Sequence, residues 1–554
     1  MKRNNAFYIK KKNTNSSKSS ATPPPQQFVL TAEYKEKIRA GSYLGKKGYT
    51  VPKSLILAAD EQEIRKELYV KPILFGPASP ETTPFPVFRE NANKYYLPRF
   101  YGISRYGAPD KSEIQEGDDI DVPFDKPLRD YQDNIIGVYM NHVTALHNTG
   151  GGILEVPCGR GKTVMGLKII SLLKKKTLIL VHKEFLMNQW IERIGEFLPS
   201  AKVGKIQAST FDIEGKDIVI GMIQTLYDKE YAAGTFDSFG LTIVDEVHRI
   251  GSEQFSRTLF KTITPYMLGI SATVDRKDKL TRVLYMFIGD KIYSENRDND
   301  DLVCVRGIEF KSTNDAFNMV ELDFRGSPKY STMITKLCEY GPRSDFIVKI
   351  IGDLLKESEN QIMILCHNRS LLTYLYEAIH HKQLATVGYY VGGMKQANLQ
   401  ETEEKQIVLA TYAMAAEALD IKTLATLVMV TPKTDITQSV GRILRVKHEN
   451  PIIVDIIDGH DLFQNQWTQR KRFYKKCNYR IRQIDSQKYA GMDIDWTTDQ
   501  TWKRVFEPKD SSGAKNACTN GMFDGSDDDH VNTIEYSDEP RKCMIDTSMF
   551  EGMD

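Results

Sequence analysis

The chain has 554 residues, too many for one compact hydrophobic core, so several domains are expected. Apolar residues make up 41% and charged residues 27% of the composition, which is ordinary for a folded protein and excludes a wholly disordered or fibrous chain. The net charge of +1 creates no overall field that attracts a polyanion. Any nucleic-acid contact must therefore come from local patches.

The seven cysteines are scattered and form no set of Cys-x-x-Cys pairs, which predicts reduced thiols inside a cell and no zinc site. No stretch approaches the roughly 18 to 20 apolar residues that span a bilayer, and the N-terminus has no apolar signal core. We therefore expect a soluble, intracellular protein of the cytoplasm or nucleus that does not bind membranes.

Residues 1–27 hold only basic charges together with serine and proline runs, and this composition predicts a disordered tail. Residues 28–126 combine aromatic residues, short apolar runs and many prolines, which predicts a small α+β accessory domain of unknown role. From 485 to 554 apolar periodicity disappears and acidic residues dominate, so an acidic disordered tail is expected.

Between these parts, short apolar runs alternate with helix-like segments, the pattern of a parallel sheet covered by helices on both faces. GGILEVP, TLILVH, DIVIG and LTIVDE define one such domain over residues 127–300. QIMILCH, QIVLAT, LVMVTP and PIIVDIID define a second over residues 343–484. Residues 301–342 are predicted to be a linker or edge segment between two tandem α/β domains.

The run PCGRGKT lies between a predicted strand and a predicted helix, where a phosphate-binding loop belongs. Its glycines let backbone amides approach phosphates, and the helix N-terminus adds positive potential. Lys162 would contact the phosphates and Thr163 would hold Mg²⁺. The strict pattern has glycine where this chain has Val156, so the loop alone leaves a chance turn as an alternative. The ATP-binding residues predicted here are Pro157, Cys158, Gly159, Arg160, Gly161, Lys162 and Thr163.

The run DEVH follows the apolar strand LTIV in the same domain. An aspartate at the carboxyl end of a strand can reach a metal ion, so Asp245 is predicted to bind Mg²⁺. The adjacent Glu246 can orient and deprotonate the attacking water. Acidic residues that cap the next helix are the alternative for this motif alone.

With both motifs present, residues 127–460 resemble the superfamily 2 helicases, in which ATP binds between two RecA-like domains. The resemblance rests also on LRDYQ, QTL, SAT, AEALD and QSVGRILR, in that order. It implies adenine recognition by Arg129 and Gln132, nucleotide contact by Asp420, and coupling by His248, Ser271, Ala272 and Thr273.

The run QSVGRILR is the most specific of these motifs, because Arg442 and Arg445 share one face of a predicted helix. The resemblance implies that both reach the γ-phosphate as arginine fingers, with Gln438 in the same catalytic motif. An arginine finger typically increases the rate of hydrolysis about 10³- to 10⁵-fold. A surface helix with two arginines is the alternative.

The loop, the DEVH box and Arg276 with Asp278 after SAT resemble the XPB and UvsW branch. That branch includes helicases of large DNA viruses, among them the poxvirus transcript-release helicase, and GYTVPKS is similar to viral sequences. Lys277 replaces a glutamate of the XPB type, which puts a DNA-opening role of that element in doubt, and Ala418 replaces a glycine. A viral member would act in a viral factory or virion.

The resemblance implies nucleic-acid contacts at Gln224, Thr225, Arg369 and Thr411. QRKRFYKKCNYRIR adds cations, among them Arg472, Lys475 and Lys476, that can grip phosphates between aromatics that can stack on bases. The alternative is an amphipathic helix whose rings pack under the second domain.

We expect ATP hydrolysis, with Mg²⁺, coupled to movement along nucleic acid. The resemblance implies DNA rather than RNA, 3′→5′ travel, and partners in transcription, repair or replication. A translocase that does not separate strands, or a transcript-release factor, would use the same residues. A non-catalytic scaffold is the third alternative, and intact Lys162, Asp245, Glu246 and Arg442 argue against it.

Overall fold

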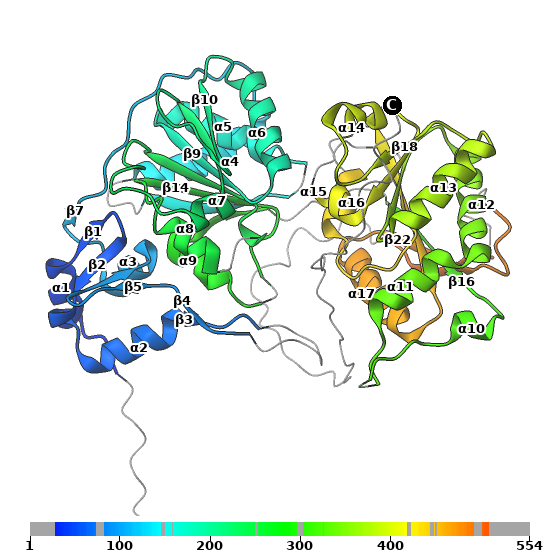
Figure 1. The fold of residues 1–554 in the computed structure, drawn as a ribbon, viewed down its shortest axis with the longest axis horizontal. Helices are drawn as coiled ribbons and strands as arrows, with labels where there is room; N and C mark the ends of the chain where they lie inside the picture. The colour runs from blue at the N-terminus through cyan, green and yellow to red at the C-terminus, as the bar shows by residue number, and fades with distance from the viewer. Residues whose placement is uncertain are drawn as a thin grey trace, which may run out of the picture.

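The computed structural model describes residues 28–73, 82–145, 150–157, 159–249, 253–276, 278–295, 303–324, 326–417, 421, 423–443, 448, 451–491 and 501–508. Figure 1 shows two large sheets in separate lobes and a small sheet beside the first. This confirms the predicted α/β class with two RecA-like domains and a small N-terminal α+β unit.

Several predicted features lie outside the described residues, namely the basic tail, Cys158, Lys277, Ala418, Asp420, Arg445 and residues 509–554. For Gln438 and Arg442 the structure describes the backbone but not the side chains. Among the described helices, none is both long enough and apolar enough to cross a membrane.

The N-terminal unit is a sheet in the order β5-β6-β2-β1-β7, and its strands alternate so that Leu44, Tyr49, Val51 and Tyr95 face the helices. The elements are α1 Ala32–Gly41, β1 Tyr43–Gly45, β2 Gly48–Pro52, the 3-10 helix η1 Lys53–Leu55, α2 Ala58–Leu68, β5 Arg89–Glu90, β6 Lys94–Leu97, α3 Arg99–Tyr106 and β7 Lys111–Ser112, with a separate ribbon of β3 Tyr69–Val70 and β4 Phe85–Pro86.

The N-terminal unit shares its core with the first large domain, because one cluster of buried residues includes apolar side chains from both. The Arg99 guanidinium donates to the carbonyls of Thr264 (2.9 Å) and Pro265 (2.8 Å). A Cβ on Gly151 would lie 2.3 Å from the ring of Phe100, so this glycine makes room for α3. The unit is thus anchored directly against the strand that leads into the phosphate loop.

The accessory sheet ends earlier than the predicted boundary at residue 126. Residues 118–125 run instead along the first large domain, where Ile120 donates a backbone hydrogen bond to Lys174 (2.9 Å). Burial of Ile120 and Val122 in that domain's core explains the difference, since a few apolar side chains suffice to fix an otherwise polar segment.

The first large sheet has the order β11-β10-β12-β9-β13-β14-β8-β15 and is parallel except for β11. Its elements are α4 Asp130–Thr144, β8 Gly151–Glu155, α5 Lys162–Leu173, β9 Thr177–Val181, α6 Glu184–Phe197, β10 Val203–Gln207, β11 Thr210–Phe211, β12 Ile218–Met222, α7 Ile223–Asp228, β13 Leu241–Asp245, η2 Val247–Arg249, α8 Glu253–Leu259, β14 Tyr266–Ser271, α9 Thr281–Ile288 and β15 Lys291–Ser294.

Helices cover both faces of this sheet. Apolar residues of α4, α5 and α6 pack on one face, and those of α7, α8 and α9 pack on the other. Every residue of β13 is buried, as expected for a central parallel strand between two helical layers. The carboxyl ends of these strands form the edge where the predicted nucleotide motifs lie.

The second large sheet has the order β18-β19-β17-β20-β21-β16-β22-β23, with only β23 antiparallel to its neighbour. Its elements are β16 Cys304–Phe310, α10 Asp315–Asn318, α11 Tyr330–Glu339, α12 Gly341–Glu357, β17 Gln361–Cys366, α13 Arg369–His381, β18 Val387–Tyr390, α14 Gln396–Glu403, β19 Ile407–Thr411, α15 Tyr412–Glu417, β20 Leu424–Met429, α16 Thr437–Ile443, β21 Ile452–Asp458, α17 Asp461–Lys476, β22 Arg480–Asp485 and β23 Lys503–Phe506.

Two further boundaries differ from the prediction. Strand β16 lies within the predicted linker, yet it pairs in parallel with β21 and β22 on either side, so it is an interior strand. Strand β23 lies within the predicted tail, where buried Trp502 packs edge-on against Tyr489 and brings the strand onto β22. In both segments, charged residues stand next to the buried apolar residues in the sequence. The apolar pattern of a strand is therefore not visible there.

Two buried arginines fix the loop that leads from β20 to α16. Arg343 pairs with Asp458 (2.6 and 2.8 Å) and donates to the carbonyl of Val430 (2.8 Å). Arg470 pairs with Asp455 (2.7 and 2.9 Å) and donates to the carbonyl of Lys433 (2.9 Å). Removal of one partner would leave the other charge buried without compensation. The stability of the domain therefore depends on both members of each pair.

Replacing Arg343 by methionine is expected to destabilise the second domain by about 3–5 kcal/mol, because the buried Asp458 carboxylate would lose its cation. The control is Lys356→Met on the same helix, which removes an exposed partner of Asp353 and should shift stability little. Urea unfolding followed by circular dichroism measures both variants. Equal midpoints for the two would contradict the assigned role of the buried pair.

Candidate nucleotide-binding site

The predicted phosphate loop leaves the carboxyl end of β8, begins at Pro157 and enters α5 at Lys162. Gly159 and Gly161 have φ angles of 85° and 78°, a region that residues with a Cβ rarely adopt. A Cβ on Gly161 would also lie 2.4 Å from the amide nitrogen of Gln132. The glycines therefore permit a tight loop at a helix N-terminus, which favours bound anions.

The segment predicted to recognise adenine is bonded to this loop. Gln132 accepts a hydrogen bond from the backbone N–H of Arg129 (3.0 Å) and donates to the carbonyl of Arg160 (3.1 Å). The Tyr131 hydroxyl donates to the same carbonyl (3.3 Å), and the Arg160 guanidinium lies 4.0 Å from the centre of the Tyr131 ring. A side-chain amide has two N–H donors and two acceptor lone pairs, so these two hydrogen bonds do not prevent Gln132 from binding an adenine edge.

Lys162, Asp245 and Glu246 meet at the carboxyl edge of the sheet. The Lys162 Nζ atom lies 3.1 Å from Glu246 Oε1. Buried Asp245 ends β13 and accepts hydrogen bonds from the indole N–H of Trp190 and the backbone N–H of Glu246, both 2.9 Å. Glu246 has a φ of 50°, a strained conformation of the kind that clusters at functional sites. Thr163 is the second residue of α5, next to this cluster in sequence.

The two carboxylates have opposite pKa shifts. Burial, together with the charge of Glu246, raises the pKa of Asp245 to about 6. Burial acts on Glu246 in the same direction, but the Lys162 ammonium and the His248 contact outweigh it and hold the pKa of Glu246 well below its usual range. Glu246 is therefore ionised at neutral pH, the state that can accept a proton from water.

The residues predicted to couple the site form a chain of contacts away from it. The Nδ1 atom of His248 lies 3.2 Å from Glu246 Oε2 and 2.7 Å from Ser271 Oγ. Ser271 Oγ donates to the carbonyl of Thr273 (2.6 Å), one residue beyond Ala272. The DEVH and SAT runs are thus joined through side chains at the ends of adjacent strands.

Sequence reasoning missed three polar side chains around the site: Trp190, Glu155 and Glu295. Trp190 binds Asp245 as described above, and Glu295 pairs with Arg160 in the loop. Glu155 ends β8 and accepts a backbone hydrogen bond from Val274 (2.7 Å). A signal for Glu155 existed, since it is a charged residue at the end of the apolar run GGILEVP.

In the second domain, Arg442 lies on α16, which follows β20 and the loop fixed by the two buried arginines. Every backbone carbonyl from Val430 to Lys433 accepts a side-chain hydrogen bond, the middle two from Tyr412 and Tyr330. Phe185, just after β9, packs against the second-domain cluster that contains residues of α15 and α16. Phe185, at the start of α6, is therefore a point of contact between the first domain and this second-domain cluster.

The predicted nucleic-acid residues do not form one cluster of contacts. Gln224 donates to the carbonyl of His182 (3.2 Å), Thr225 accepts from the backbone of Ala208 (3.0 Å), and Arg369 donates to the carbonyl of Gly392. Thr411 is half-buried at the end of β19. The first three side chains stabilise turns at the ends of strands.

The basic run at the end of α17 divides between core and surface. Arg470 is buried in its ion pair, and Tyr474 and Tyr479 are buried in the second-domain core, as the amphipathic-helix alternative predicts. Arg482 is also buried and pairs with Glu507. The cations that remain exposed are Arg472, Lys475 and Lys476.

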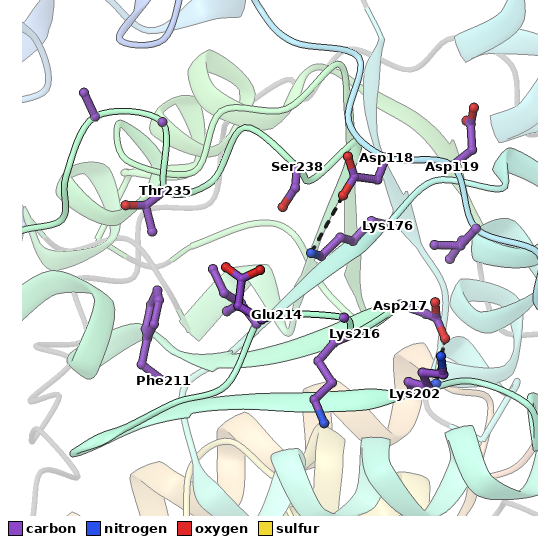
Figure 2. A pocket seen from close by; sticks show the side chains of 15 residues that line it. Asp118, Asp119, Lys176, Lys202, Phe211, Glu214, Lys216, Asp217, Thr235 and Ser238 are labelled. Carbon is purple, nitrogen blue, oxygen red and sulfur yellow. Dashed lines mark hydrogen bonds and ion pairs between the residues drawn. The ribbon is translucent and has the colours of Figure 1, made fainter.

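A cavity of about 730 Å³ lies at the opposite, amino-terminal edge of the first sheet. Figure 2 shows Lys176 directed at Asp118, at 4.0 Å, and Asp217 accepting from the backbone N–H of Lys202, at 2.7 Å. The charged side chains that line the cavity largely neutralise one another. None of the predicted nucleotide-site residues lines this cavity. The predicted phosphate loop and acidic pair lie instead at the carboxyl ends of β8 and β13.

Two family models match the two large sheets. "Type III restriction enzyme, res subunit" matches residues 125–276, and "Helicase conserved C-terminal domain" matches residues 344–447. Together with the two RecA-like sheets, they define the class of protein as an ATP-dependent helicase.

Three relatives narrow the class. A putative ATP-dependent RNA helicase of Acanthamoeba polyphaga mimivirus is 34% identical over 447 residues, covering 78% of this chain and 85% of that protein. A putative ATP-dependent RNA helicase of African swine fever virus is 28% identical, covering 64% and 74%. A DNA 3′-5′ translocase of Sulfurisphaera tokodaii is 23% identical, covering 65% and 89%. The chain belongs to the superfamily 2 helicases, in the group related to helicases of large DNA viruses and to XPB.

Replacing Trp190 by phenylalanine is expected to destabilise the protein by about 1–3 kcal/mol, because a buried carboxylate oxygen of Asp245 would lose its donor. Trp467→Phe is the matched control, since the buried indole N–H of Trp467 has no hydrogen-bond partner among the described residues. Thermal unfolding followed by circular dichroism compares them. An equal loss in both variants would mean that ring size, and not the hydrogen bond, is responsible.

Proposed function

We propose that ATP binds at the loop of residues 157–163 and is hydrolysed by water that Glu246 orients and deprotonates. The observation that carries this proposal is the contact of Lys162 with Glu246 beside Asp245 at the carboxyl edge of a parallel sheet. In open α/β sheets ligands bind at that edge, and an ammonium there is suited to the β- and γ-phosphates. Glu246 is ionised, so its carboxylate can accept a hydrogen bond from the attacking water and orient it.

We infer that Mg²⁺ is held by Thr163 and Asp245. The residues fit a divalent cation, because two adjacent carboxylates share one lysine ammonium and burial disfavours their combined charge. Hydroxyl and carboxylate oxygens are the ligands that Mg²⁺ prefers. The ion, when bound, neutralises charge on the phosphates during their transfer.

We propose that Arg442 and Arg445 complete the site from the second domain, with Gln438 on the same helix and Asp420 near the nucleotide. Packing of Phe185 against the cluster of α15 and α16 supports this arrangement. Closure would bring positive charge to the γ-phosphate where negative charge develops in the transition state. Release of phosphate would then reopen the domains and shift one domain's grip along a strand.

We propose DNA as the track and 3′→5′ as the direction of movement. The relative from Sulfurisphaera tokodaii carries that activity in its name, and the viral relatives carry RNA in theirs. The test is ATPase activity measured with single-stranded DNA, duplex DNA and RNA in parallel, beside an unwinding assay with each. If RNA stimulates the ATPase activity more than either form of DNA, the proposal of DNA as the track is wrong. If nucleic acid stimulates the activity without strand separation, the non-unwinding translocase is favoured.

Lys162→Ala and Glu246→Gln are each expected to lower the turnover number at least about 100-fold, since one removes a phosphate contact and the other a general base. Lys168→Ala, on the same helix but directed at the ring of Phe124, is the control and should retain near-normal turnover. Steady-state phosphate release measures all three, with circular dichroism to verify the fold. Normal turnover in Lys162→Ala or Glu246→Gln would refute the site.

Replacing Arg472, Lys475 and Lys476 together by alanine should weaken binding to single-stranded DNA. The slope of log affinity against log salt concentration should become shallower by about 2, because each phosphate that a cation neutralises contributes about 0.7 to that slope. The control removes two exposed lysines of α12, Lys349 and Lys356. Fluorescence anisotropy over a salt series measures the slopes; an unchanged slope in the triple variant would exclude these cations from the track.

A further inference from the structure

Glu295 connects the phosphate loop to the end of the first large domain. It directly follows β15, the strand next to β8, and residues 296–302 then link it in sequence to the second domain. Its carboxylate forms an ion pair with Arg160, and its backbone N–H donates to the carbonyl of Glu155 (3.0 Å). One residue is therefore bonded both to the loop and to the strand before it.

A second set of contacts ties the same strand to the other half of the site. Glu155 accepts hydrogen bonds from Lys291 Nζ (2.8 Å) and Ser294 Oγ (2.6 Å), both on β15. Its other oxygen accepts from the backbone of Val274, directly after the SAT run. Burial opposes ionisation of Glu155, but these donors outweigh it and keep its pKa below the usual range.

The contacts of Arg160 are suited to an ion pair with Glu295 that can form and break. Its side chain is 36% exposed and its guanidinium is shared between the Tyr131 ring and Glu295. The Glu295 side chain is 15% exposed, so the accessible half of the pair is the arginine, which can exchange partners. An exchangeable interaction next to a ligand site can differ in strength between two states of the loop, which is the requirement for energetic coupling.

We propose that Glu295 is a positioning residue that acts through Arg160 and couples occupation of the phosphate loop to the chain that leads into the second domain. This inference rests on the proposed ATP site. Phosphates in the loop would lie next to the Arg160 side chain that pairs with Glu295, so nucleotide binding changes the Arg160–Glu295 pair. The change passes to β15 and, through the SAT run, to the residues that contact Glu246.

The test compares Glu295→Gln, which removes the charge and keeps the shape, with Glu196→Gln. Glu196 pairs with Lys126 and Arg193 in the same domain but touches no loop residue in the described contacts. Hydrogen exchange of the β15 amides is measured with and without a non-hydrolysable ATP analogue. The analogue should slow exchange by at least about fivefold in the wild type and in Glu196→Gln, and by less than half that factor in Glu295→Gln.

The same variants are assayed for ATP hydrolysis with and without single-stranded DNA. Glu295→Gln should keep the KM for ATP within about twofold and lose about fivefold of the stimulation by DNA. In an Arg160→Met background, Glu295→Gln should add no further effect, because the residue acts through Arg160.

Unchanged nucleotide protection of β15 in Glu295→Gln would overturn the inference, as would an additive effect in the Arg160→Met background. Equal losses with and without DNA would also overturn it, since they indicate a general structural defect. A wild-type enzyme that no nucleic acid stimulates would contradict the proposed function, while the exchange measurement would still decide the role of Glu295.

Discussion

The contact between Lys162 and Glu246 depends on parallel strands that end at one edge of one sheet. β8 delivers the phosphate loop and β13 delivers the acidic pair, and the two strands are separated only by β14. Strand β14 ends at Ser271, which explains why this hydroxyl lies within reach of His248. Pairing the strands in another order would leave the ammonium and the carboxylates on different parts of the edge, so the topology is what assembles the charges.

The sequence pattern is sufficient to predict the strands that have uninterrupted apolar runs and the motifs at the ends of those strands. It failed at β16, where Arg306 and Glu309 break the run CVRGIEF, because Arg306 is buried against Glu357 and only the folded chain brings that partner close. The sequence likewise groups Arg470 with the cations that could bind phosphates, because nothing nearby in the sequence reveals that Asp455 neutralises it. Periodicity predicts which side of an element is buried, but not which charges are paired there.

The same limit applies within the site. The pattern predicted Lys162 and Glu246, which belong to recognisable motifs, and missed Trp190, whose role depends on α6 lying over the end of β13. Glu295 has no motif at all and acquires a partner only because β15 pairs with β8. Residues that touch a ligand tend to sit in compact sequence patterns, whereas those that hold them in place come from wherever the fold supplies a neighbour.

The contact of Phe100 with Gly151 has a consequence for how the chain can be divided. The match to the type III restriction enzyme res subunit begins at residue 125, yet α3 and the side chain of Arg99 fill space over the strands of that domain. A fragment cut at the family boundary would bare the apolar surface of α9 and leave the carbonyls of Thr264 and Pro265 without their donor. Because the accessory segment and the first large domain share one hydrophobic core, they are expected to unfold together as one cooperative unit.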